Sequence, residues 1–219
     1  MSLAEIETAC EQLSSGNAAE RTTAERFLLN IRSSENAMQV ARAVIDSSNL
    51  PSACFQAACI LKDALLRDWN KLSIEARMEL QSHILQHVVR QDCCAGSGGL
   101  KPFVRAQLLQ SFAVIVKRGW LDGPPNLFSD LLGYIESLMA GAGTRAVGAW
   151  TLLALLDEFA SSSRSVVGLS WEYHHSCQQR INGDGHLLRM FATVLAAVYG
   201  DIDALRAAVA AAAAPVPRP

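Results

Sequence analysis

The stretch "FQAACILKDALLRDW", residues 55–69, decides the fold of this chain. Ala and Leu, which are strong helix formers, supply much of it, and its apolar residues recur at helical spacing. These apolar residues are Phe55, Ala58, Cys59, Leu65, Leu66 and Trp69. Pro51 lies just upstream and suits the first turn of a helix, where a missing amide hydrogen is tolerated. The stretch therefore predicts an α-helix that begins at Pro51.

Capping and helix-breaking residues divide the rest of the chain into helices of comparable length. Ser34 and Ser73 are predicted N-caps and Pro102 is a predicted helix start, because these residue types favour helix N-termini. Alternation typical of β-strands is absent, so the predicted fold class is all-α. Besides the helices that start at Pro51 and Pro102, the predicted helices span about residues 3–13, 18–32, 35–47, 73–90, 126–140, 144–160, 171–180 and 186–199.

These helices form pairs along the chain. The first helix of each pair starts near residue 20, 52, 101 or 144, a spacing of roughly 30 to 50 residues that brackets the period of HEAT and armadillo repeats. A helix hairpin cannot bury all of its apolar faces alone, so stacking on neighbours is implied. The stretch 146–156 is apolar nearly all round, as expected of an enclosed helix. We predict an α-solenoid of about four HEAT-type repeats, with a compact helical bundle as the alternative.

Two stretches depart from this pattern. Residues 91–100, "QDCCAGSGGL", have the Gly and Ser content of a flexible loop. Residues 200–219 form an Ala-rich and then Pro-rich low-complexity tail, after a repeat segment that spans residues 1–199. A solenoid normally closes with a repeat whose outer face is polar, and no such repeat is evident. We therefore expect a truncated product or a fragment of a longer solenoid.

Composition narrows the class of protein further. The 219 residues carry 19 Lys and Arg against 21 Asp and Glu, without the basic excess or basic stripe that nucleic-acid binders usually show. The longest apolar run, residues 146–156, is about half the length that spans a bilayer. The N-terminus lacks the basic region of a secretory signal, and the cysteines do not form a disulfide framework. We expect a chain of the cytosol or nucleus that binds no nucleic acid and does not insert into membranes.

Catalytic and metal-binding patterns are weak. The sequence lacks four common catalytic motifs: the nucleophile elbow, the phosphate-binding loop, the dinucleotide fingerprint and the zinc-protease helix. We therefore predict that the chain is not an enzyme and binds no cofactor. Two clusters contain ligand types for zinc, but adjacent cysteines cannot easily reach one tetrahedral ion and the spacing of structural sites is missing. We expect ordinary surface histidines and loop cysteines in both. The clusters are His83, His87, Cys93 and Cys94, and His174, His175 and Cys177.

The phrase "AVIVKRGWLD", residues 113–122, places two cations beside a glycine and a tryptophan. Gly119 suits the left-handed position that ends many helices, and Trp120 would then pack back onto Ile115. Lys117 and Arg118 would lie in the last turn, where cations oppose the negative end of the helix dipole. We favour this helix-end interpretation over a basic patch that binds a phosphate or a partner.

The second helix of each pair carries polar residues on one face. In a solenoid such helices line one continuous surface. Two interpretations stay open, a merely solvated face and a concave protein-binding surface that selects its partner by mixed charge. The candidate residues are Glu35, Gln39, Arg42 and Asp46 in one helix, and Glu79, His83, Gln86 and Arg90 in the next.

Three phrases, taken together, resemble one family. The stretch at residues 55–69 is similar to the second N-terminal repeat of importin-β-type (karyopherin-β) nuclear transport receptors. "AVIVKRGWLD" and "LLALLDEFASSSRSVVGLSWEYHHSC" resemble the N-terminal region of export receptors in that family. The ending "KRGWLD", the pair "EF" with its serine run and "GLS" followed by "EYH" have the same order there. The resemblance covers about residues 18–199, while the loop 91–100 is expanded and the tail departs from it.

The resemblance implies a nuclear export receptor of the HEAT-solenoid type. Such receptors bind the GTPase Ran in its GTP form together with cargo, and cross the nuclear pore on Phe-Gly nucleoporins, so they shuttle between nucleus and cytoplasm. Their N-terminal repeats contact Ran through the second helices, here about residues 35–47, 73–90 and 126–140. The eight candidate residues named above would then lie on the Ran-binding face. The alternative is a stand-alone HEAT- or armadillo-like adaptor with no link to Ran.

Overall fold

Several helices begin at the serine and proline residues that the sequence analysis identified as helix starts. Helices α4 (Pro51–Asp68) and α6 (Pro102–Trp120) each begin at a proline. At the start of α5 (Ile74–Val89), the Ser73 hydroxyl accepts a hydrogen bond from the amide of Ala76 at 3.2 Å. These three predicted starts are confirmed, because each residue satisfies or removes a helix amide that has no partner inside the helix.

The computed structural model describes residues 2–94, 99–121, 123–124, 126–160 and 169–212. This part of the chain forms helices and turns without a strand, so the all-α prediction is confirmed. A 3₁₀ turn, Trp69–Lys71, follows α4, and a π-helical turn, Arg90–Cys94, continues α5. The other helices are α1 (Leu3–Gln12), α2 (Ala18–Ser33), α3 (Ala37–Ser47), α7 (Leu127–Ala140), α8 (Arg145–Ala160), α9 (Trp171–Gly183) and α10 (His186–Ala212).

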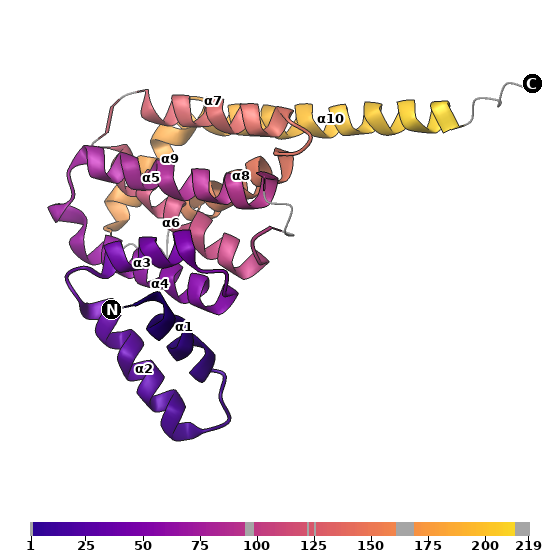
Figure 1. Ribbon diagram of the computed structural model, residues 1–219. Coiled ribbons are helices and arrows are strands. Elements are labelled where there is room, and N and C mark those ends of the chain that lie inside the picture. The colour runs from indigo at the N-terminus through magenta and orange to yellow at the C-terminus, as the bar shows by residue number, and fades with distance from the viewer. Residues whose placement is uncertain (1, 95–98, 122, 125, 161–168, 213–219) are drawn as a thin grey trace, which may run out of the picture.

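The helices stack in two layers, from α1 and α2 at one end to α7 and α10 at the other (Figure 1). Helices α4, α6 and α8 pack side by side in the first layer. Helices α3, α5 and α7 form the second layer, each packed on the next helix of the first. This arrangement is the predicted HEAT-like solenoid. The helices predicted to be second in their pairs are α3, α5 and α7, so they do share one layer.

Two expectations differ from the structure, one about the burial of α8 and one about the length of α10. Helix α8 is not enclosed on all sides, since Leu153 is 55% exposed on its outer side. Helix α10 passes residue 199 without a break and reaches Ala212, well into the predicted tail. Of the predicted loop 91–100, residues 91–94 belong to the π-helical turn and residues 95–98 lie outside the described residues. The flexibility of that loop and the domain boundary at residue 199 stay predictions.

The prediction that Ser34 caps the N-terminus of a helix is wrong. Ser34 ends α2 instead, and its hydroxyl donates to the carbonyl oxygen of Ile31 at 2.7 Å. Helix α3 starts later, at Ala37, so Glu35 lies in the turn before the helix rather than in its first turn. A serine hydroxyl serves either end of a helix, because it can donate to a carbonyl as well as accept from an amide.

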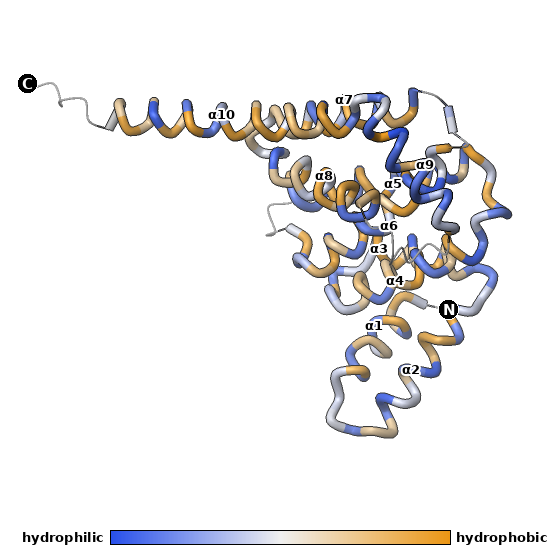
Figure 2. Tube along the Cα trace, turned by 180° about the vertical axis from the view of Figure 1, so that it is seen from behind, coloured by the Kyte–Doolittle hydropathy of each residue, from blue (hydrophilic) through white to orange (hydrophobic). Residues whose placement is uncertain are grey.

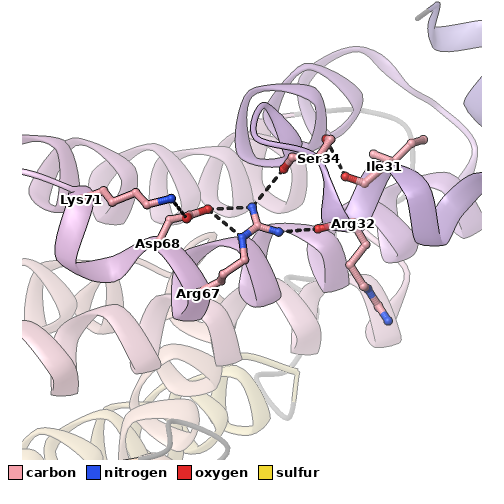
Figure 3. Close-up of polar contacts among 6 residues, drawn as sticks. All are labelled: Ile31, Arg32, Ser34, Arg67, Asp68 and Lys71. Carbon is pink, nitrogen blue, oxygen red and sulfur yellow. Dashed lines mark hydrogen bonds and ion pairs between the residues drawn. The ribbon is translucent and has the colours of Figure 1, made fainter.

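Arg67 of α4 contacts the same end of α2 (Figure 3). Its guanidinium donates to the carbonyl oxygens of Arg32, at 2.7 Å, and Ser34, at 3.0 Å. Asp68 holds the guanidinium in place by accepting from Nε at 3.0 Å, and its other oxygen accepts from Lys71 at 2.8 Å. Arg67 therefore ties the end of α2 to α4 and satisfies carbonyls that the helix leaves without partners.

The predicted helix ending at Gly119 is also wrong. Helix α6 continues through Gly119 to Trp120, and the left-handed backbone among the described glycines occurs elsewhere. Trp120 is buried and stacks on Phe128 of α7 at 4.5 Å between ring centroids, rather than folding back onto Ile115. Burial of this large ring between helices stabilises the extra helical residues, because aromatic side chains contribute much of the energy of a core.

Side chains from α9 satisfy the last carbonyls of α6. The Tyr173 hydroxyl lies 2.9 Å from the carbonyl oxygen of Lys117 and 2.8 Å from that of Arg118, and donates to this pair. Arg180 donates to the carbonyl oxygen of Trp120 at 3.3 Å. A tertiary contact thus replaces the local glycine cap that the sequence predicted.

Neither cation of "KRGW" lies in an exposed patch. Lys117 is fully buried, donates to the backbone carbonyl of Glu158 and lies 3.5 Å from that carboxylate. Burial lowers the pKa of Lys117, and the nearby Glu158 opposes that shift. Arg118 lies 5.1 Å from the Trp69 ring centroid and donates to the carbonyl oxygen of Leu66 at 3.4 Å. Both cations therefore join helices, and the basic-patch interpretation is wrong.

We predict that Lys117→Met lowers the free energy of unfolding by about 3–5 kcal/mol, because it leaves the buried Glu158 carboxylate without its cation. Lys117→Met combined with Glu158→Leu recovers part of that loss. Lys71→Met is the matched control, since Lys71 is exposed and pairs only at the surface, where such pairs contribute about 1 kcal/mol or less. Urea unfolding measures all three. Equal losses for Lys117→Met and Lys71→Met would contradict the buried pair.

Candidate functional site

Polar side chains of α3 and α5 meet along the second layer, and we call this surface the α3–α5 face. Arg42 of α3 binds Glu79 of α5 through both guanidinium branches, with nitrogen–oxygen distances of 2.7 and 3.3 Å. Glu79 stays 62% exposed in this pair. A two-pronged contact of this kind fixes the orientation of both groups. It also joins neighbouring repeats, since Arg42 and Glu79 come from different helix pairs.

Asp46 connects the same two helices one turn further along. Its carboxylate oxygens lie 2.9 and 3.0 Å from Nε2 of His83. Nδ1 of His87 lies 3.4 Å from the same carboxylate. The structure thus brings together four of the eight predicted residues, Arg42, Asp46, Glu79 and His83, and adds His87. Sequence reasoning placed His87 only in a weak metal cluster, although its spacing of four residues from His83 puts both on one side of α5.

The two histidines are neutral partners of Asp46 near neutral pH. Burial lowers the pKa of His83, and nearby Arg42 lowers it further. Burial also lowers the pKa of His87, against the opposing effect of Asp46. Because a carboxylate only accepts hydrogen bonds, the ring nitrogen of His83 that faces Asp46 carries the hydrogen. The Nδ1 atom of His83 is then a buried acceptor without a hydrogen-bond partner.

The remaining predicted residues do not join this network. Gln39, Gln86 and Arg90 are exposed, on α3, on α5 and at the start of the π-helical turn. Within the described residues Arg90 makes no ion pair, so its charge is available to a partner. Glu35 is exposed but lies before α3.

A groove of about 280 Å³ extends the α3–α5 face toward α7. Leu85 and Gln86 line it from α5, and Asp130 and Tyr134 line it from α7. Gln86 therefore belongs to both surfaces. Sequence patterns offered no signal for this groove, because two helices about fifty residues apart in the chain form it and only their packing brings these side chains together.

The opposite layer carries a larger hollow. A groove of about 710 Å³ lies between α6 and α8, with Phe103, Trp150 and Leu153 among its lining residues. Phe103 and Leu153 are each about half exposed. The guanidinium of Arg105 lies 3.3 Å from the Trp150 ring centroid and 3.1 Å from Asp92, which holds the tryptophan and the arginine together. The groove is thus mainly apolar and open to solvent.

The described residues contain no group of three or more His, Cys, Asp or Glu placed to hold a metal ion, and the side chain of Cys94 lies outside the described part. Burial raises the pKa of Cys10 and of Cys177 to about 11, so both thiols are protonated at neutral pH and are poor nucleophiles. None of the helices described is both long and apolar enough to cross a membrane.

A stack of helix pairs with charged side chains along one layer is an architecture that protein-binding repeat proteins use. The family model of exportin-4 matches residues 1–211, and the chain belongs to that family. The match extends beyond residues 18–199, which carry the resemblance of the three phrases, and it includes most of α10.

Curated relatives agree with the family. The chain is 24% identical to exportin-4 of Dictyostelium discoideum over 186 residues, which are 78% of this chain and 16% of that protein. It is 29% identical to mouse Ran-binding protein 17 over 143 residues, 64% of this chain and 12% of that protein. Exportin-7-B of Xenopus laevis is 25% identical over 141 residues, 63% of this chain and 12% of the relative. The chain therefore spans less than a fifth of the length of these relatives.

We predict that the free energy of unfolding falls as the pH drops below about 6.5, the ordinary histidine pKa. The folded state resists protonation of His83 and His87, because their folded pKa values are lowered, while the unfolded state takes up the protons. His87→Gln removes one of these groups and makes the fall shallower.

His175→Gln is the control, since His175 is exposed on α9 and far from the α3–α5 face in the chain. Urea unfolding at pH 7.5 and pH 5.5 measures the change for each protein. The two variants losing the same stability between those pH values would show that the buried histidine does not resist protonation.

Proposed function

We propose that this chain is the Ran-binding N-terminal segment of a nuclear export receptor, and that the α3–α5 face contacts Ran in its GTP form. The observation that carries the proposal is an ordered, partly exposed array of mixed charge on the α3–α5 face of an exportin-family solenoid. Two relatives support it by name, one as an exportin and one as a Ran-binding protein. A receptor of this kind moves between nucleus and cytoplasm.

The geometry of the α3–α5 face suits recognition of a folded, charged partner. The Arg42–Glu79 and Asp46–His83 contacts hold four polar side chains in fixed positions, so little side-chain entropy is lost when a partner binds. Arg90 and Glu79 present opposite charges from the same helix. Complementary charge of both signs favours one docking orientation and suppresses wrong partners.

The apolar groove between α6 and α8 is a second, separate binding surface. In a full-length receptor we assign it to the phenylalanine side chains of Phe-Gly nucleoporins, because Phe103 and Leu153 leave exposed apolar area there. Cargo proteins bind the longer solenoid, which offers more surface than this segment. The competing function is an adaptor that uses the α3–α5 face for a partner other than Ran.

We predict that the chain binds Ran loaded with a GTP analogue more tightly than Ran loaded with GDP, and that Arg90→Glu weakens the GTP-form complex about tenfold. Arg90 is the sharper site, since Arg42→Glu also breaks the internal pair with Glu79. Arg26→Glu on α2 is the matched control, because Arg26 is exposed and lies outside this face. Biolayer interferometry at fixed ionic strength measures the affinities.

Equal affinity for both nucleotide forms would argue against the proposal. Equal losses for Arg90→Glu and Arg26→Glu would move the Ran site away from the α3–α5 face. A folded chain that ignores Ran, and still binds another protein through Arg90, would favour the adaptor. Circular dichroism of each variant establishes that the helices remain folded.

A further inference from the structure

The groove between α6 and α8 runs along two helices that point the same way. Arg105 contacts Trp150 near the starts of the two helices, and Lys117 contacts Glu158 near their ends. Figure 2 shows that α8 is apolar along most of its length, and its sequence becomes acidic only at Asp157 and Glu158. The lining of the groove therefore changes from apolar at one end to acidic at the other.

The apolar end of the groove is held in place by contacts within the chain. Phe103 meets the ring of Phe55 edge to face, with 5.6 Å between the ring centroids. The Arg105 guanidinium lies over the ring of Trp150. Alanines line the groove from both helices, and their short side chains leave space between the larger ones. A large apolar side chain can enter this space with little ordering of the groove, which lowers the entropic cost of binding.

Asp157 gives the acidic end of the groove a net negative charge. Of the other charged groups in the lining, Arg105 pairs with Asp92 at 3.1 Å and Glu158 lies 3.5 Å from Lys117. Asp157 is exposed and makes no ion pair within the described part of the chain. It also lies in the last turn of α8, where the helix dipole adds negative potential. This end of the groove therefore attracts a cation.

The Lys62 ammonium of α4 approaches the groove from the side. It donates to the side-chain oxygen of Gln110, which lines the groove from α6, at 3.0 Å. Lys62 itself does not line the groove and does not pair with Asp157. The Asp157 carboxylate thus stays open to a cation from solvent.

We propose that the groove selects Phe-Gly segments that carry a lysine or arginine about three residues from the phenylalanine. The proposal rests on the assignment of this groove to Phe-Gly nucleoporins, and adds which of their segments the groove prefers. The phenylalanine packs against Phe103 and Trp150, and the cation pairs with Asp157. A segment with an acidic residue in the same place is repelled by Asp157 and binds more weakly.

The spacing of the two sites sets the spacing in the ligand. Trp150 and Asp157 lie about two turns apart on α8, a rise of about 10 Å along the helix axis. An extended chain covers this distance in about three residues. A basic residue next to the phenylalanine would therefore fall short of Asp157.

Titration of the full chain with three peptides tests the proposal. The peptides have the sequence Xaa-Ser-Ser-Phe-Gly-Ser-Xaa, with lysine, serine or glutamate at both Xaa positions, so that either chain direction brings one Xaa to Asp157. We expect the lysine peptide to bind at least about fivefold more tightly than the glutamate peptide, with the serine peptide between them. Nuclear magnetic resonance at fixed ionic strength measures the affinities, and the indole signal of Trp150 reports occupation of the groove.

Two variants and a matched control locate the preference. Asp157→Lys should reverse it, so that the glutamate peptide binds more tightly. Asp130→Lys is the control, because Asp130 is exposed on α7 in the other layer and should leave the preference unchanged. Phe103→Ser should weaken the binding of all three peptides and leave the ratio between lysine and glutamate peptides the same. Circular dichroism establishes that each variant is folded.

Equal affinities for the lysine and glutamate peptides would overturn the proposal and leave the groove assigned to Phe-Gly segments. A preference that survives Asp157→Lys would also overturn it, because the cation would then bind elsewhere. So would equal binding of a lysine peptide with alanine in place of phenylalanine, which would show a general cation site. Failure of all three peptides to bind would remove the assignment to Phe-Gly nucleoporins, and this proposal with it.

Discussion

The packing around the end of α6 depends on the interaction of the buried Lys117 ammonium with Glu158 of α8. A buried ammonium is costly unless a partner accepts its hydrogens, so Lys117 fixes α8 through the carbonyl and carboxylate of Glu158. Its neighbour Arg118 contacts α4, and Tyr173 of α9 donates to the carbonyls of both. The three phrases that resemble transport receptors, far apart in the chain, therefore meet at one point.

The contacts at this meeting point link all three phrases. Trp69 ends the first phrase, and two guanidiniums lie near its ring centroid, that of Arg77 at 4.3 Å and that of Arg118 at 5.1 Å. Arg118 belongs to the second phrase, and Tyr173 to the third. Arg118 of the second phrase donates to the carbonyl oxygen of Leu66 in the first. The Tyr173 hydroxyl of the third phrase donates to the carbonyl oxygens of Lys117 and Arg118 in the second. The layer of α4, α6 and α8 is thereby fixed, and α3 and α5, packed upon it, present the α3–α5 face in a defined geometry.

Much of the fold and half of the candidate face could be predicted from the sequence. Spacing placed Arg42, Asp46, Glu79 and His83 on two helix faces, and packing of those helices made them partners. The sequence did not predict that Glu35 would fall before its helix, that His87 would join Asp46, or that α7 would add a groove. Those outcomes depend on where neighbouring helices lie, as at the end of α2, where Arg67 of α4 donates to the carbonyl oxygens of Arg32 and Ser34.

The sequence by itself determined the helical class, the repeat order and most helix starts, because these follow from local propensity and from the period of apolar residues. Tertiary structure decided the ends of helices and the roles of charged residues. "KRGW" has every local feature of a surface helix end, yet it is buried, because Trp120 and Lys117 find partners on α7 and α8. Burial and pairing depend on contacts between distant segments, and local sequence does not carry that information.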